Sequence, residues 1–281
     1  RTRADERRAR AQGPRGGWQQ RAWRIGAVAV LILVIYAPSV VIAYPMARNN
    51  LGLSSGYRAS LEWLRTNTPE PFGAGDYYYS RYRPGNTPRP SYTVMAWWDY
   101  GYEIIRLGRR VPVANPTQSA ADIAGRFFTA LDEGEAVKVL DQTHTRYVIT
   151  HAEVPILPRG GLVQGKFETL AAWAGKDISQ YWETFLTKDP KGGLGPLVLF
   201  HPAYYRTMVV RLYVFGGQAA VPNDSTYVIT YAERPNPDGT KGKETLESRR
   251  FKTYEAAAAW IDRMGHTGRT IVGLDPKQTP V

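Results

Sequence analysis

Twenty consecutive residues, from Ile25 to Tyr44, carry no charge, and this run constrains the possible folds more than any other feature of the sequence. At a rise of about 1.5 Å per residue, a helix of this length is about 30 Å long, the thickness of the hydrocarbon core of a bilayer. Trp18 and Trp23 precede the run, where aromatic side chains favour the membrane interface. The run therefore predicts one transmembrane helix over residues 25–44.

Two other interpretations of this run are weaker. A secretory signal peptide has a shorter apolar core and a small-residue cleavage site, and it lacks so long a flank. A buried helix of a soluble protein remains the alternative.

The charges before the run predict its orientation. Residues 1–24 hold eight Arg against Asp5 and Glu6, a net charge of +6. Because basic flanks stay in the cytoplasm, we expect residues 1–24 to be cytoplasmic and residues 45–281 to be extracytoplasmic at the cell membrane.

The net charge of the whole chain, +11, raises the question of nucleic-acid binding. Residues 1–24 carry +6 of it, so residues 45–281 carry only +5. Most of the positive charge therefore lies in the amino-terminal tail, which argues against a nucleic-acid partner.

The chain contains no Cys, which excludes disulfides and thiolate metal sites. It begins with Arg1 and not with Met, so we expect a fragment or a processed piece.

Beyond the apolar run, strand and helix signals alternate, which is typical of a mixed α/β core. Strand-like residues begin at Tyr92 and again at 146–150, and helices are predicted over 119–131 and 135–140. From about residue 222, short strands separated by turns dominate. We predict an α+β protein, with one transmembrane helix, an extracytoplasmic core domain over 45–220 and a small β-rich peripheral module over 221–281.

Four further predictions concern single elements. Residues 166–174 and the amphipathic stretch 177–187 are predicted to be helices, as are residues 254–264. Residues 208–211 (Met-Val-Val-Arg) alternate in a way that favours a strand.

The common catalytic patterns are missing. Four His, at positions 144, 151, 201 and 266, are far apart in sequence, and there is no metal-binding HExxH pair or Gly-rich phosphate loop. A membrane-anchored glycosidase would need two carboxylates about 5–10 Å apart in a groove. The pair Asp132 and Glu133 is more typical of a solvated surface.

One sequence motif is unusual. It consists of Trp97, Trp98, Asp99, Tyr100 and Gly101. A simple interpretation is the end of a strand, with one Trp buried and Asp99 starting a turn. The functional interpretation is a pocket, in which indole N–H groups donate and a carboxylate accepts around a small hydroxyl. Glycine at the last position allows a sharp turn or a close approach of the backbone to a ligand.

This motif, WWDYG, resembles the signature of oligosaccharyltransferase catalytic subunits. The continuation GYEIIRLGRRVPVANPTQSAADIAGRFF and the segments YRASLEWLRTNTPEP and LFHPAYYRTMVVRLYVFGG are similar to the archaeal AglB branch. The resemblance covers roughly residues 54–275. It implies a glycosyltransferase that moves a lipid-linked oligosaccharide to Asn in Asn-X-Ser/Thr sequons, with this chain as the last membrane span and the sequon-reading domain.

The resemblance also implies roles for single residues. Trp97, Trp98 and Asp99 would bind the hydroxyl of the Ser or Thr two residues after the Asn, within a site completed by Tyr100 and Gly101. A second family motif, of the DxxK or MxxI type, is best matched by Val163-Gln164-Gly165-Lys166-Phe167, which keeps the lysine and lacks the aspartate. Lys166 is either part of the sequon site or a solvated lysine at a helix start, and residues 208–211 are an alternative match by spacing.

The resemblance implies partners and cofactors as well. The partners are an acceptor polypeptide, a lipid-linked oligosaccharide donor and the bilayer. The full-length enzyme would use Mn²⁺ or Mg²⁺ held by carboxylates upstream of this chain, so we expect no catalytic residue and no metal site in residues 45–281, and no transfer by this chain alone. The alternative is a non-catalytic, membrane-anchored domain that binds peptides or assists a separate transferase.

Overall fold

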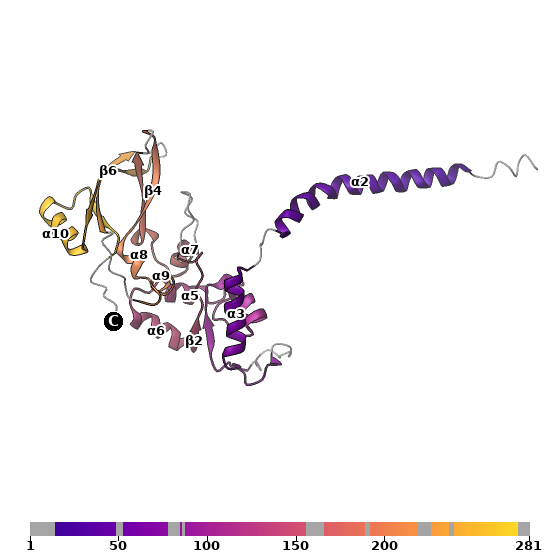
Figure 1. The fold of residues 1–281 in the computed structure, drawn as a ribbon, viewed down its shortest axis with the longest axis horizontal. Helices are drawn as coiled ribbons and strands as arrows, with labels where there is room; N and C mark the ends of the chain where they lie inside the picture. Colours follow the sequence, from indigo (N-terminus) through magenta and orange to yellow (C-terminus); the bar gives the residue numbers. More distant parts are fainter. Residues whose placement is uncertain are drawn as a thin grey trace, which may run out of the picture. The chain divides into compact units, whose positions relative to one another are not determined.

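The computed structural model of the chain describes residues 15–48, 53–77, 85, 88–155, 166–188, 192–218, 226–235 and 239–274. It divides into two compact units, Arg1–Arg58 and Ala59–Val281 (Figure 1). The helices and strands are, in chain order, α2 (Arg15–Arg48), α3 (Ser55–Asn67), β1 (Thr93–Met95), η2 (Trp98–Tyr100), α4 (Gly101–Glu103), η3 (Ile104–Gly108), α5 (Ala121–Phe128), α6 (Glu133–Gln142), β2 (Thr145–Val148), α7 (Lys166–Trp173), η4 (Ile178–Gln180), β3 (Trp182–Lys188), β4 (Leu194–Phe200), α8 (Pro202–Arg206), α9 (Met208–Val214), β5 (Thr226–Pro235), β6 (Lys241–Phe251), α10 (Tyr254–Met264) and β7 (Arg269–Val272).

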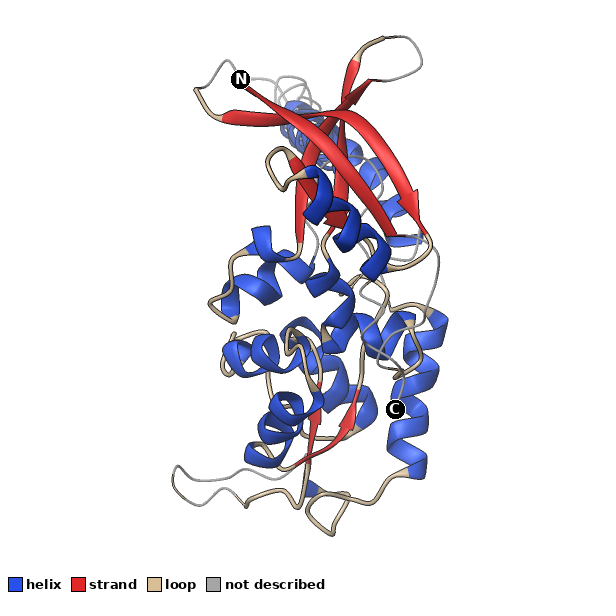
Figure 2. Cartoon of the chain, turned by 90° about the vertical axis from the view of Figure 1, so that its left-hand side faces the viewer, coloured by secondary structure: helices blue, strands red, loops and turns tan. Residues whose placement is uncertain are grey.

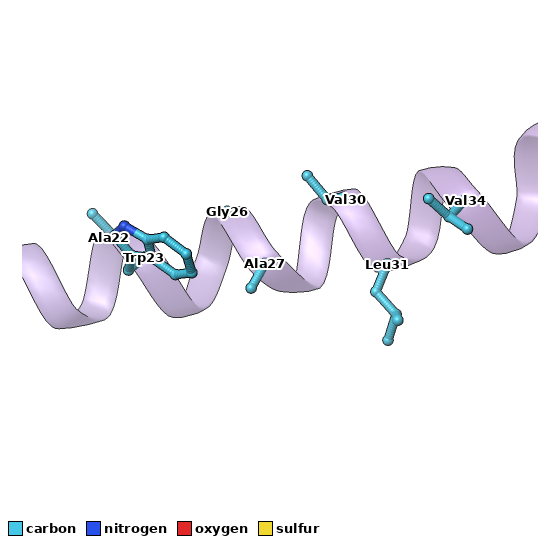
Figure 3. A pocket seen from close by; sticks show the side chains of 7 residues that line it. All are labelled: Ala22, Trp23, Gly26, Ala27, Val30, Leu31 and Val34. Carbon is cyan, nitrogen blue, oxygen red and sulfur yellow. The ribbon is translucent and has the colours of Figure 1, made fainter.

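The first unit is built on the long helix α2. Its segment Gln20–Pro45 is the single candidate membrane span within the described residues, with a mean hydropathy of 2.7 and no buried part. Figure 3 shows apolar side chains of this helix, among them Leu31 and Val34, which are 59% and 63% exposed. Pro38 lies inside the helix and does not break it. Such a surface is stable in lipid and unfavourable in water.

The second unit contains a two-stranded parallel sheet, in which β1 pairs with β2 from Thr93↔Thr145 to Met95↔Val148. The chain between these strands forms η2, α4, η3, α5 and α6, so the connection is a crossover, as parallel pairing requires. Val94 forms a bridge to Pro112 on the other side of β1. Both strands end at the same edge of the sheet, so the segments that follow them meet there.

Arg110 ties α3 to this sheet. Its side chain is fully buried, and its guanidinium donates to the carbonyl oxygens of Arg65 and Thr68 at 3.0 and 2.6 Å. It also donates to Glu70 Oε1 at 3.2 Å. These bonds satisfy carbonyl groups at the end of α3 that have no partner within the helix.

A five-stranded sheet has the order β4-β3-β6-β5-β7, and Figure 2 shows it as a group of strands separate from the two-stranded sheet. β3 pairs antiparallel with β4 and parallel with β6, and β5 pairs antiparallel with β6 and β7. Phe185 of β3 packs with Ile229 and Val272 on the sheet, while Ala257 and Ile261 of α10 pack on Val228.

The predicted helix over 177–187 is wrong, because residues 182–188 form the strand β3. Trp182, Phe185 and Leu186 recur every three to four residues, which mimics a helix face. In the fold, Trp182 and Phe185 are buried, and the whole strand pairs with Leu194–Phe200. Pairing with a distant segment therefore overrides the local periodicity.

The predicted strand over 208–211 is also wrong, because Met208–Val214 is the helix α9. The four residues from Met208 to Arg211 are all buried, so no face alternates with solvent. Consecutive burial of this kind does not distinguish a strand from a short internal helix.

The remaining predicted elements agree in type with the structure, and the predicted class, a long apolar helix followed by mixed α/β structure, is confirmed. The boundary predicted between residues 220 and 221 lies outside the described residues. The five-stranded sheet takes β3 and β4 from before this boundary and β5, β6 and β7 from after it. The division into a core domain and a peripheral module stays a prediction.

Candidate functional site

The WWDYG motif lies directly after β1, at the edge of the two-stranded sheet where both strands end. Met95 is the last residue of β1, and Trp98–Tyr100 turn into the short 3₁₀ helix η2. Residues 149–153 follow β2 at the same edge, and Ile149 N–H donates to Met95 O at 2.9 Å. The parallel pairing thus brings together two segments that are fifty residues apart.

Gly101 starts α4 in an ordinary helical conformation, with φ −59°, so it is not needed for a left-handed turn. A Cβ atom at this position would lie 2.5 Å from Asn115 Cα and 2.6 Å from Ala114 O. The glycine is therefore required because another stretch of backbone crosses it closely, and the sequence offered no sign of that partner.

The two Trp of the motif have different partners. Trp97 is 2% exposed, and its Nε1 donates to Asp99 Oδ2 at 3.1 Å. Nε1 of Trp98 is buried and has no hydrogen-bond partner among the described residues. The rings lie 5.1 Å apart between centroids at 46°. Trp97 orients the carboxylate, whereas Trp98 keeps an unused donor, and a buried donor without a partner is unfavourable unless a ligand supplies one.

Lys166 comes to the motif from the first turn of α7. The helix is fixed by Phe167 and Leu170, which are fully buried, and the Phe167 ring contacts Tyr181 with 5.1 Å between centroids. α5 crosses α7 closely at Gly125, where a Cβ would lie 2.8 Å from Leu170 O. Core packing therefore sets the place of the lysine.

The Lys166 ammonium is held at three points. Its Nζ donates to Tyr100 Oη at 2.9 Å and lies 3.1 Å from Glu153 Oε2 and 3.3 Å from Asp99 Oδ2. It also lies 4.4 Å from the centroid of the Tyr100 ring, a cation–π contact. Lys166 thus lies beside Asp99 and Tyr100, and the residues Val163–Gly165 of the second predicted motif lie outside the described residues.

The groups around Lys166 shift one another's pKa values. Burial disfavours its positive charge, but the hydrogen bond to Tyr100 and the carboxylates of Glu153 and Asp99 outweigh burial, so the pKa of Lys166 is raised. The hydrogen bond from Lys166 lowers the pKa of Glu153, and burial raises the pKa of the Tyr100 phenol. At neutral pH the ammonium and the Glu153 carboxylate are charged and the phenol is protonated.

Glu153 and His151 were not predicted as site residues. They follow β2, and Nδ1 of His151 lies 3.4 Å from Tyr100 Oη. The strand predicted at 146–150 was the signal that could have found them, because residues that follow neighbouring parallel strands converge and this strand pairs with β1.

A pocket of about 500 Å³ opens beside the motif, lined by Trp97, Trp98, Asp99, Lys166, Glu168, Thr169 and Ala172. Asp99 Oδ2 is occupied by Trp97 and Lys166, while Oδ1 accepts no hydrogen bond from any residue that the structure describes. The Trp98 N–H and the free carboxylate oxygen are one donor and one acceptor. A hydroxyl group, which both donates and accepts, satisfies them together.

The pocket does not fit a divalent metal ion. Such ions need several converging oxygen ligands, and the described ranges contain no group of three His, Asp or Glu that could hold one. The cation beside Asp99 is instead the Lys166 ammonium, at 3.3 Å. Asp99 and Glu153 both contact this ammonium, so the described residues of the pocket offer hydrogen-bond donors and acceptors around one shared cation.

Fold and pocket together define a class: a mixed α/β domain that follows a candidate membrane span and has a pocket lined by two Trp, one Asp and one Lys. Residues 54–155 match the family model described as the AglB core domain. Two curated relatives are similar over most of the chain. The dolichyl-phosphooligosaccharide-protein glycotransferase 3 of Archaeoglobus fulgidus is 26% identical, over 69% of this chain and 25% of its own length. The dolichyl-monophosphooligosaccharide-protein glycotransferase AglB of Haloferax volcanii is 28% identical, over 85% and 26%.

Two crystal structures of an Archaeoglobus fulgidus oligosaccharyltransferase are similar, each at 25% identity. One is tethered to an acceptor peptide containing the NVT sequon; its TM-score is 0.52, over 76% of this chain and 28% of that one. The other is a complex with zinc and sulfate; its TM-score is 0.50, over 79% and 30%. The chain is thus similar to oligosaccharyltransferases of the AglB family over most of its length. The chain spans about a quarter of the length of these curated relatives.

Proposed function

We propose that this chain is the sequon-reading part of an oligosaccharyltransferase, which transfers a lipid-linked oligosaccharide to Asn in Asn-X-Ser/Thr. The observation that carries this is the buried, unpaired Trp98 N–H beside the free oxygen of Asp99 in one pocket. The Ser or Thr hydroxyl donates to Asp99 and accepts from Trp98. Trp97, Lys166 and Tyr100 hold the carboxylate and its counter-ion in place, and Gly101 lets the motif pack against the neighbouring backbone.

A site of this kind rejects residues that lack the hydroxyl. When Ala replaces Thr, the buried Trp98 N–H stays without a partner and Oδ1 of Asp99 gains none, and this loss discriminates far better than a missing methyl group does. The names of the relatives, glycotransferases that use dolichyl-linked oligosaccharides, and the NVT peptide in the similar structure support the same substrates here.

The transfer step belongs to the longer protein. Holding the hydroxyl orients the acceptor Asn, and orientation accelerates transfer without acid–base chemistry in this pocket. We propose that the metal, Mn²⁺ or Mg²⁺, is held by ligands of the longer protein outside these residues. The chain alone binds the acceptor and does not transfer the glycan.

The chain is further proposed to cross the cell membrane once, with residues 1–24 in the cytoplasm and residues 45–281 outside. The eight Arg before the span support this orientation. Because the chain has no Cys, a single introduced cysteine can be labelled specifically, and its labelling shows on which side of the membrane that residue lies. We expect a membrane-impermeant thiol reagent added to intact cells to label Glu247→Cys and not Thr2→Cys. The reverse pattern would refute the orientation.

Hydroxyl recognition is tested on the ¹⁵N-labelled chain in detergent micelles. Eight Trp give eight indole N–H signals, and Trp98→Phe identifies the one from Trp98. We expect an Asn-X-Thr peptide to shift this signal strongly, because the free N–H gains a hydrogen bond, while a matched Asn-X-Ala peptide leaves it in place. Equal shifts with both peptides, or no shift with either, would contradict a hydroxyl site at Trp98.

A further inference from the structure

Lys166 has two carboxylates at almost the same distance. Its Nζ lies 3.1 Å from Glu153 and 3.3 Å from Asp99, and the two carboxylates come from segments that follow different strands of the sheet. One ammonium therefore serves two carboxylates, and the three groups together carry one net negative charge. The carboxylate of Asp99 is not fully neutralised by its counter-ion.

The segment that carries Glu153 is anchored by the two residues that follow it. Val154 is 1% exposed, and its N–H donates to His151 O at 3.0 Å. The Tyr204 hydroxyl donates to Pro155 O. Glu153 itself is exposed, with 62% of its side chain accessible. A fixed backbone thus presents an exposed carboxylate to Lys166, whereas a fold-stabilising ion pair would be more deeply buried.

The position of the ammonium matters for Asp99. Without Glu153, only the contact with Tyr100 would oppose a shift of the ammonium toward both oxygens of Asp99, and such a shift would remove the free acceptor. We propose that Glu153 is a positioning residue of the hydroxyl pocket, which holds the Lys166 ammonium at Oδ2 of Asp99 and keeps Oδ1 open for the Ser or Thr hydroxyl of the acceptor. This role rests on the proposed function, and it adds a residue outside the WWDYG motif to the recognition of the sequon.

The test is a double-mutant cycle on the full chain in micelles, with affinity for an Asn-X-Thr peptide as the readout. Glu153→Gln keeps the shape and removes the charge. We expect it to weaken binding about threefold to tenfold, and to have no further effect when Lys166 is already replaced by Met, because Glu153 acts through Lys166. Binding of the Asn-X-Ala peptide is expected to stay unchanged in every variant. Glu247→Gln, on an exposed part of β6, removes one negative charge elsewhere and serves as the matched control.

The outcomes separate this role from the proposed function. If the unmodified chain binds Thr and Ala peptides equally, the hydroxyl site itself fails. If it prefers Thr, but Glu153→Gln binds normally, the role of Glu153 alone is refuted. Equal weakening with and without Lys166 would also refute it, because the carboxylate would then act independently of the ammonium.

Discussion

Replacing Asp99 by Asn in the full-length transferase is expected to lower the glycosylation rate of an Asn-X-Thr acceptor by about 10²–10⁵, where sites built to bind a hydroxyl reach about 10⁴–10⁵. The amide keeps the size of the side chain but loses the charge that accepts from Trp97 and pairs with Lys166. Trp98→Phe removes one neutral donor and keeps the ring, so we expect a smaller loss, about tenfold to a hundredfold.

The measurement is the initial rate of glycosylation in membranes that contain each variant at equal amount. Both side chains are partly exposed and lie at the pocket, so the fold and membrane insertion should survive. A residual rate that no longer distinguishes Thr from Ser or Ala in the acceptor would support loss of hydroxyl reading. Near-normal rates for both variants would contradict the assignment of the pocket.

Local chemistry allowed much of the fold to be predicted. The uncharged run was predicted as a helix from its length and apolar composition, and α2 contains it with Pro38 inside the helix. Tyr92 to Met95 and residues 146–150 were recognised as strands from their β-branched and aromatic content, and the structure pairs them as β1 and β2. Such elements have strong local signals because apolar, β-branched or aromatic residues dominate them.

The wrong predictions share a physical cause. Residues 182–188 form a strand only because Leu194–Phe200 pairs with them, and residues 208–214 form a helix only because the surrounding chain buries four consecutive residues. In both cases the deciding interaction is with residues distant in the sequence or on other elements. The hydrophobic periodicity of a short segment does not depend on such partners, so it cannot predict them.

Only part of the candidate site could be predicted from the sequence, for a related reason. The motif was visible because two adjacent Trp before a carboxylate are unusual, and the resemblance gave them a role. The division of work between Trp97, which bonds Asp99, and Trp98, whose N–H stays unpaired, depends on side-chain directions that the sequence does not state. Glu153 depends on the parallel register of the two strands, and no motif marks it.

Gly101→Ala is expected to lower the free energy of unfolding by about 3 kcal/mol, at the upper end for an overpacked site. The added Cβ would lie 2.5 Å from Asn115 Cα and 2.6 Å from Ala114 O. These are backbone atoms, which cannot rotate away as a flexible side chain can, so α4 and the segment at 114–115 must separate. Since φ at Gly101 is −59°, the loss arises from this collision and not from the backbone conformation.

Gly108→Ala is the matched control, because its Cβ would meet only the Leu64 and Leu61 side chains closely, at 3.3 and 3.6 Å. We expect a loss of about 1 kcal/mol or less there, because methyl groups can shift by a few tenths of an ångström. Thermal unfolding of the chain in micelles, followed by circular dichroism, would show a fall in Tm of roughly 6–12 °C for Gly101→Ala and a much smaller one for the control. Separation at Gly101 also moves Asp99, two residues earlier, so the indole signal of Trp98 should respond more weakly to the Thr peptide. If Gly101→Ala were as stable as Gly108→Ala, the close crossing of the two backbones would be wrong, and with it the explanation of the last residue of the motif.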